Sequence, residues 1–325
     1  MKSVVEDIKK GSFKPVYLFY GEEAYLKQQY KNRLKNAVLP EGDTINLSIY
    51  SGKGIDVKEM IAQADTMPFF AEYRLLLIED SGFFKNANQQ LAEYIPSIPE
   101  ETIMLFVESE VDKRGKLYKA VSKKGSVVEF TAQNEQTLTR WILGILKTEG
   151  KMITSGAMKQ FLEKTGTDME RIRQELEKLI CYCMEKESIT EEDVAVICSE
   201  QTENKIFDMI NAMAEKKQKK AMELYYDLLA LKEPPMRILY LITRQFNLLM
   251  QVKELSEEGY SAKTISERLK MAGFIVRNCL RQAEYFSLKT LKEALQDCVR
   301  MEEAVKTGRM NDVMSVELLL VKYSS

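Results

Sequence analysis

The sequence of 325 residues contains no histidine. A Ser-His-Asp triad, a Cys-His nucleophile pair and the His-Glu-x-x-His helix of zinc proteases all need an imidazole, so these hydrolytic sites are excluded. The five cysteines are odd in number and scattered, which is typical of reduced thiols rather than of a disulfide framework. Cys181 and Cys183 point to different faces of a predicted helix and have only Cys198 nearby. We therefore predict no metal site and no catalytic residues.

Long apolar runs and an excess of one charge are also missing. No stretch approaches the roughly 20 apolar residues that span a bilayer, and the segment from Met1 to Asp7 lacks the apolar core of a signal peptide. The 47 basic residues nearly balance the 49 acidic residues, so any contact with nucleic acid has to be local. These features predict a cytoplasmic protein without membrane contact, and a 45% hydrophobic content suffices for two or three packed cores.

Strand-like apolar runs alternate with helical patterns in the first part of the chain. The runs are Val16 to Tyr20, Ile45 to Tyr50, Arg74 to Asp80, Thr102 to Val107 and Val127 to Phe130. Strands that alternate with helices form a parallel sheet covered on both faces, which predicts an α/β domain over residues 1–134. From Glu135 onward we find no convincing strand. Helical patterns predict a small helical domain over residues 135–202, with Asp168 as a helix cap, and a larger one over residues 203–325.

Gly21 follows the first predicted strand and precedes a helix, which is the geometry in which backbone N–H groups hold a phosphate. A phosphate-binding loop needs several glycines and a Gly-Lys-Ser/Thr ending, whereas the carboxylates of Glu22 and Glu23 follow this single glycine. The pair Glu79-Asp80 ends the third strand where ATPases handle magnesium, but no lysine and hydroxyl lie opposite it. We therefore predict a degenerate nucleotide site that binds no ATP, and no cofactor.

Three large apolar side chains, Met67, Phe69 and Phe70, surround Pro68 between a predicted helix and the third strand. Pro68 ends the helix that runs from Val57 to Ala64, so helix amphipathicity does not explain these side chains. Two interpretations stay open at this point. The side chains either fold back as a plug into their own core, as most such residues do, or stand out as a hydrophobic wedge.

A basic cluster, Lys216-Lys217-Gln218-Lys219-Lys220, lies between two predicted helices. Local positive charge of this kind suits contacts with DNA phosphates. The alternative is a solvated helix junction, and no interleaved aromatic residues indicate base stacking.

Several of these motifs together resemble the delta subunits of bacterial DNA polymerase III. The motifs are Gly21-Glu22-Glu23 after the first strand, Met67-Pro68-Phe69-Phe70 before the third, the turn Asp112-Lys113-Arg114, Thr167-Asp168, and the helix Gln174-Glu175-Leu176-Glu177-Lys178-Leu179. The resemblance covers essentially the whole chain in order. It implies an AAA+-like α/β domain, a small helical lid and a helical collar domain.

The resemblance also implies a function. A delta subunit opens the ring-shaped beta sliding clamp by pressing a hydrophobic wedge into it, and by position this wedge falls on Met67, Pro68, Phe69 and Phe70. Its collar would join the other clamp-loader subunits, tau/gamma and delta prime, around primer-template DNA. The subunit would hydrolyse no ATP itself, although it belongs to a nucleotidyltransferase, the DNA polymerase III holoenzyme.

Two other functions compete with this interpretation. One is an active ATPase, against which the sequence Gly21-Glu22-Glu23 argues. The other is a non-catalytic helical adaptor with a decayed nucleotide fold, which would serve a different AAA+ assembly.

Overall fold

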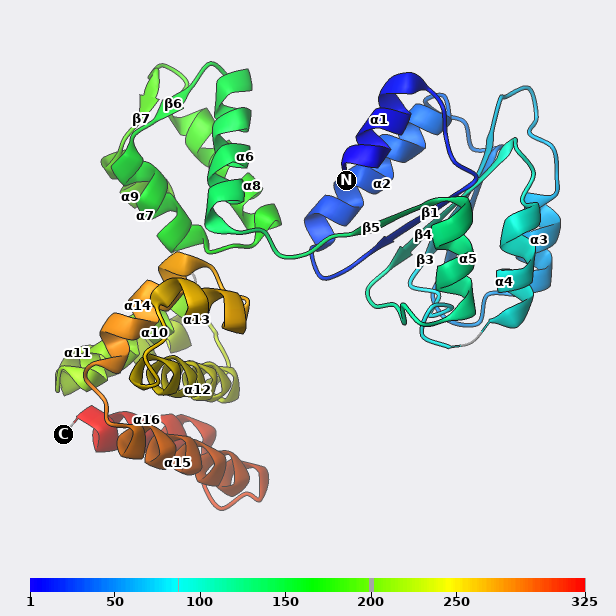
Figure 1. The fold of residues 1–325 in the computed structure, drawn as a ribbon. Coiled ribbons are helices and arrows are strands. Elements are labelled where there is room, and N and C mark those ends of the chain that lie inside the picture. The colour runs from blue at the N-terminus through cyan, green and yellow to red at the C-terminus, as the bar shows by residue number, and fades with distance from the viewer. Residues whose placement is uncertain (87, 199–201, 325) are drawn as a thin grey trace. The chain divides into compact units, whose positions relative to one another are not determined.

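A computed structural model describes residues 1–86, 88–198 and 202–324 of the chain. The chain divides into two compact units, Met1–Gln133 and Asn134–Ser325 (Figure 1). The first unit is an α/β layer structure and the second is almost entirely helical. The predicted fold class, a parallel α/β sheet followed by helical domains, is confirmed.

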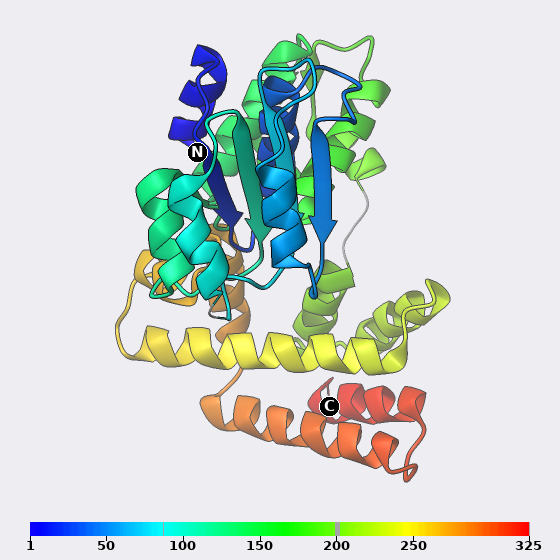
Figure 2. The ribbon, with the colours of Figure 1, turned by 90° about the vertical axis from the view of Figure 1, so that its right-hand side faces the viewer.

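The first unit is built on one five-stranded parallel sheet, whose arrows point the same way in Figure 2. Its strands are β1 (Val16–Tyr20), β2 (Leu47–Ser51), β3 (Arg74–Glu79), β4 (Thr102–Glu108) and β5 (Ser126–Glu129). They lie in the order β2-β3-β4-β1-β5, so β2 forms an edge. Both faces of the central strands are buried, which explains why their sequences are unbroken apolar runs.

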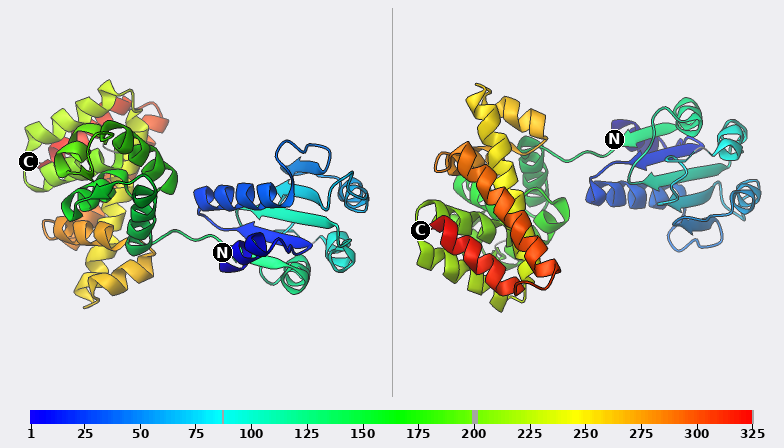
Figure 3. Two further views of the ribbon diagram at one scale, coloured as in Figure 1. Left: turned by 90° about the horizontal axis from the view of Figure 1, so that it is seen from above. Right: turned by 90° about the horizontal axis from the view of Figure 1, so that it is seen from below.

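Helices cover both faces of this sheet (Figures 1 and 3). Within the described residues the helices are α1 (Lys2–Lys10), α2 (Ala24–Val38), α3 (Val57–Ala64), α4 (Gln89–Tyr94) and α5 (Lys116–Lys124), and a 3-10 turn, η1 (Ile95–Ser97), follows α4. Alternate strand residues such as Leu18, Leu76 and Phe106 pack against α3, α4 and α5. Sequence patterns did not indicate α1, in which only Val4 is buried. The helix predicted after Gly21 is α2, which begins at Ala24 because Glu23 is its N-cap.

The second unit begins with four helices, α6 (Glu135–Thr148), α7 (Ser155–Thr165), α8 (Met169–Tyr182) and α9 (Glu191–Ile197). The Asp168 carboxylate accepts a hydrogen bond from the Arg171 N–H and caps α8, as predicted. The expectation that no strand follows Glu135 is wrong. Two short parallel strands, β6 (Met152–Ile153) and β7 (Ser188–Ile189), pair with each other. Two residues are too few to show the alternation by which a strand is recognised.

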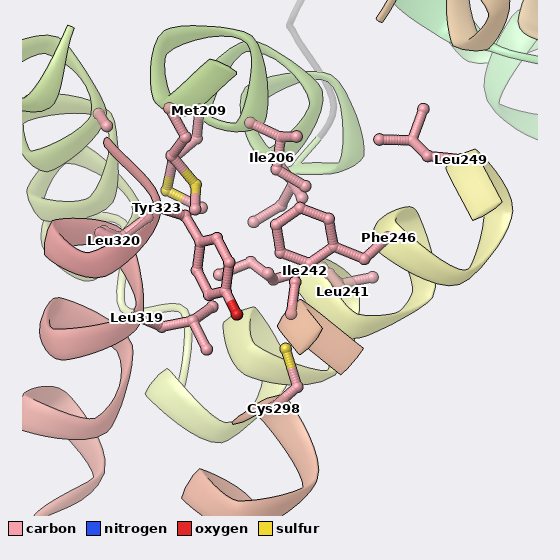
Figure 4. Packing of buried hydrophobic residues seen from close by; sticks show 14 of the residues in the cluster. Ile206, Met209, Leu241, Ile242, Phe246, Leu249, Cys298, Leu319, Leu320 and Tyr323 are labelled. Atoms are coloured by element: carbon pink, nitrogen blue, oxygen red, sulfur yellow. The ribbon is translucent and has the colours of Figure 1, made fainter. Parts of the chain in front are cut away.

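The rest of the second unit, as far as the structure describes it, consists of the helices α10 (Thr202–Ala214), α11 (Gln218–Ala230), α12 (Pro235–Glu257), α13 (Ala262–Leu269), α14 (Gly273–Ala283), α15 (Leu288–Lys306) and α16 (Asp312–Ser324). One hydrophobic core joins them, and its buried members all lie between Ile206 and Tyr323. Figure 4 shows side chains of α10, α12, α15 and α16 converging in this core. The ring centroids of Phe246 and Tyr323 lie 6.0 Å apart. We call residues 203–325 the collar.

The separate lid, residues 135–202, and the collar boundary at residue 203 stay predictions. Residues 199–201 of the predicted lid lie outside the described part of the chain. Among the helices that the structure describes, none combines the length and the apolar character needed to cross a membrane.

Candidate functional site

Three backbone N–H groups at the turn between β1 and α2, those of Gly21, Glu23 and Tyr25, donate to acceptors within the chain. The Gly21 N–H donates to the Ser109 carbonyl at 3.3 Å, and the Glu23 N–H donates to the Phe130 carbonyl at 3.1 Å. The Glu23 carboxylate caps α2 by accepting the Tyr25 N–H at 3.2 Å. A phosphate at this helix N-terminus would need these same N–H groups and would meet a carboxylate.

Gly21 itself is fixed by a close approach of two backbones. Its φ is 115°, and a Cβ at this position would lie 2.3 Å from the Phe130 carbonyl oxygen.

We expect Gly21→Ala to lower the free energy of unfolding by at least about 2 kcal/mol, because strain and a backbone clash add together. Gly11→Ala is the control. The φ of Gly11 is also positive, at 63°, but nothing lies within 4 Å of the place that a Cβ would take. That variant is expected to lose about 1 kcal/mol. Urea unfolding compares the two, and equal losses would contradict the close approach.

Two lysines of α2 reach the carboxyl ends of β3 and β4. The Lys31 ammonium lies 2.6 Å from a carboxylate oxygen of Glu79. One turn earlier, the buried Lys27 ammonium donates to the Glu108 carbonyl at 3.1 Å, and burial lowers the pKa of Lys27. The charge of Glu79 is therefore balanced by a side chain of α2.

The neighbouring carboxylates also have partners within the chain. The buried Glu108 carboxylate accepts hydrogen bonds from the hydroxyl and N–H of Ser81 and from the Gly82 N–H, and burial raises its pKa. Asp80 accepts a hydrogen bond from the Ser109 hydroxyl at 3.1 Å. The residues of the predicted degenerate nucleotide site therefore lie at the strand ends and in the adjoining turns: Gly21, Glu22, Glu23, Glu79 and Asp80.

Sequence reasoning overlooked Lys27, Lys31 and Glu108. One signal was present, because Lys27 and Lys31 lie four residues apart on the side of α2 that also carries the buried Leu34. Lysines on an apolar helix face indicate an internal acidic partner, since an unpaired ammonium is rarely buried.

The loop between α3 and β3 presents three exposed apolar side chains. Met67 is 77% exposed, Phe69 56% and Phe70 97%. The rings of Phe69 and Phe70 pack edge to face with centroids 4.6 Å apart. This exposure contradicts the interpretation of the three side chains as a plug in their own core. We refer to Met67, Pro68, Phe69 and Phe70 as the wedge.

The backbone of the wedge is bonded to two buried polar side chains. The Asn46 amide accepts the Phe69 N–H at 2.7 Å and donates to the Phe69 carbonyl at 3.0 Å. The Arg74 guanidinium donates to the Thr66 carbonyl at 3.0 Å and to the Met67 carbonyl at 3.3 Å. Sequence reasoning did not find these roles, because Asn46 lies 23 residues from its partner.

The lysines of the predicted DNA contact lie at the turn before α11 and in its first residues: Lys216, Lys217, Lys219 and Lys220. Lys217 pairs with Glu215 at 2.6 Å, and Lys219 lies 3.9 Å from Glu223. These acidic neighbours reduce the local positive charge that phosphate contacts require.

A stripe of exposed apolar residues lies along α16 of the collar. Met314, Leu318 and Val321 follow one another at intervals of four and three residues, so they share one helix face. On the adjacent α11, the half-exposed Tyr226 donates its hydroxyl to Glu317 at 2.6 Å. We call Met314, Leu318 and Val321 the α16 stripe.

Comparison with known proteins gives concordant matches along the chain. The family model for the DNA polymerase III delta subunit matches residues 17–131, and the model for the C-terminal domain of that subunit matches residues 203–323. DNA polymerase III subunit delta of Bacillus subtilis is 30% identical over 98% of this chain and 95% of its own length. A probable DNA polymerase III subunit delta of Aquifex aeolicus is 21% identical over 75% of this chain and 72% of its own length.

A solved structure agrees with these sequence matches. The Bacillus subtilis DNA clamp loader delta protein superposes with a TM-score of 0.70 at 30% identity, covering 99% of this chain and 99% of that one. Both the α/β unit and the collar are therefore shared with proteins of one kind. The chain belongs to the DNA polymerase III delta subunit family.

Proposed function

We propose that this protein binds the sliding clamp through the wedge and holds the ring open for loading onto primed DNA, without hydrolysing ATP. The observation that carries the proposal is the wedge itself, three large apolar side chains exposed on a hydrogen-bonded backbone. Exposed apolar groups of this size mark binding sites in soluble proteins. The family assignment supports the sliding clamp as the partner.

The energetics of the wedge suit this task. Burying one large apolar side chain is worth roughly 1.5–3 kcal/mol, so three together can offset the cost of a strained ring. The fixed backbone reduces the ordering cost that usually opposes binding. The subunit would thereby select an open state of the clamp rather than perform a chemical step.

The strand ends support a role without nucleotide. The N–H groups of Gly21 and Glu23 already have acceptors, and Lys31 already neutralises Glu79. An ATP triphosphate would have to displace these contacts and approach the Glu23 carboxylate. In this proposal the α/β domain is a binding scaffold with the AAA+-like arrangement and not an ATPase.

The collar is proposed to join the other loader subunits, tau/gamma and delta prime. The α16 stripe supports this assignment, because the centres of stable protein interfaces are apolar and depleted of charge. The basic segment from Lys216 to Lys220 is a weaker candidate for contact with primer-template DNA, since Glu215 and Glu223 lie beside it.

Calorimetric titration tests the proposal on the full chain. Purified sliding clamp is expected to bind in nucleotide-free buffer, and magnesium-ATP is expected to give no binding heat at micromolar concentrations. An ATPase would bind ATP at micromolar or tighter affinity, which would contradict the second expectation. An adaptor for another assembly would bind neither ligand, and failure of the clamp titration would overturn the proposal.

A further inference from the structure

We propose that Asn46, held by Asp43, and Arg74 are positioning residues that hold the wedge in its clamp-binding form before the clamp arrives. This inference rests on the proposed function of the wedge. It concerns residues that do not themselves present apolar surface, because Asn46 and Arg74 are only 2% and 4% exposed. We call Asp43, Asn46 and Arg74 the bracket.

The Asn46 side chain bonds the backbone of the wedge in the way that the backbone of a neighbouring strand would. Its side-chain amide uses one donor and one acceptor on the N–H and carbonyl of the same residue, Phe69, so the Phe69 backbone is held at two points. The Asp43 carboxylate fixes this amide in turn, accepting its second N–H at 2.7 Å and the backbone N–H of Asn46 at 3.0 Å. These bonds lower the pKa of Asp43, so the carboxylate stays ionised as an acceptor.

Arg74 holds the other side of the loop. Its guanidinium bonds two successive carbonyls, those of Thr66 and Met67, from a buried position at the start of β3. The planar guanidinium presents several donors in fixed directions, which a lysine ammonium on a flexible stem does not reproduce. The backbone on both sides of Pro68 is therefore anchored to the sheet.

The backbone at Phe70 shows why anchoring is needed. Its φ is 49°, a left-handed conformation that is unfavourable for a bulky aromatic residue. Such a conformation persists only when the surroundings impose it. The bracket bonds the immediately preceding residue, Phe69, and so holds the segment that projects the most exposed side chain of the wedge.

The bracket is expected to act on clamp affinity through pre-organisation. A loosened loop would have to be ordered at the moment of binding, and that loss of conformational freedom would lower the affinity for the clamp. We expect a loss of affinity of about 10- to 100-fold. The apolar atoms that touch the clamp would be unchanged.

The experiment is a double-mutant cycle on the full chain, with clamp affinity measured by calorimetry. Asn46→Ala is expected to weaken clamp binding about 10- to 100-fold in the native background. In a background that already carries Phe69→Ala and Phe70→Ala, the same change is expected to have little further effect, because the groups that it positions are gone. Arg74→Lys should weaken binding in the same non-additive way.

Two controls separate positioning from a general loss of stability. Val121→Ala removes buried volume from α5, away from the loop, and should lower the melting temperature with unchanged clamp affinity. Hydrogen exchange at the Phe69 N–H should accelerate in Asn46→Ala while exchange in β1 and β4 stays slow. Native-like affinity of Asn46→Ala, or additive effects in the cycle, would overturn the inference. If the unmodified chain failed to bind the clamp, the proposed function itself would fail.

Discussion

Replacing Phe69 and Phe70 together by alanine is expected to weaken clamp binding by several kcal/mol while the melting temperature stays nearly unchanged. The first effect follows from the hot-spot scale, on which exposed aromatic anchors dominate an interface. The second follows from exposure, because substitutions of exposed side chains away from core packing usually change stability by less than about 0.5 kcal/mol. The edge-to-face contact between the two rings adds roughly 0.5–1.5 kcal/mol at most.

Phe84→Ala is the matched control for this variant. Phe84 is a phenylalanine of the same domain but is 3% exposed and packs on Phe106 with ring centroids 5.3 Å apart. Its removal should cost on the order of 3–5 kcal/mol of folding free energy, and any loss of clamp binding should follow unfolding. Thermal unfolding and clamp affinity are measured on both variants. A strongly destabilised double variant, or a stable one with normal clamp affinity, would refute the role of the wedge.

The double variant Met314→Glu and Leu318→Glu in the α16 stripe is expected to lose assembly with the loader while it keeps its affinity for the clamp. This chain should fail to assemble with the other loader subunits, since two charges at the apolar centre of an interface leave desolvated, unpaired groups. Its fold should survive, because both positions are exposed and glutamate is a good helix former. Its affinity for the clamp should equal that of the native chain.

Size-exclusion chromatography with purified loader subunits measures this assembly. Val196→Glu in α9 is the control, because it places a single glutamate on an exposed apolar residue outside the collar. That control should join the loader normally. Normal assembly of the Met314→Glu and Leu318→Glu variant would place the collar interface on another face.

Buried apolar runs made most of the sheet predictable. The bounds of β1 agree with the run from Val16 to Tyr20, and β4 extends the predicted run by one residue to Glu108. The bounds of helix α7 are set by local signals in the sequence, because Thr154 caps it and Gly166 ends it. Local chemistry fixes such elements, so the sequence alone reveals them.

Contacts between distant parts of the chain were not predictable in the same way. The choice between a core plug and an exposed wedge depends on whether other elements cover Met67, Phe69 and Phe70, and no local pattern records that. The partner of Asn46 lies 23 residues away, and that of Lys31 lies 48 residues away. Polar residues of this kind look like surface residues until the tertiary fold pairs them.

The pairing of Lys31 with Glu79 has a consequence for how the protein responds to the state of the cell. A subunit whose strand ends are balanced by ATP and magnesium changes its local electrostatics with the adenylate ratio. Here the balancing cation is part of the polypeptide, so it cannot be diluted, exchanged or hydrolysed. Under the proposed function, the shape of this edge is set when the chain folds and does not follow the nucleotide state. Beside partners that cycle with nucleotide, a subunit of the proposed kind would supply a fixed geometric reference.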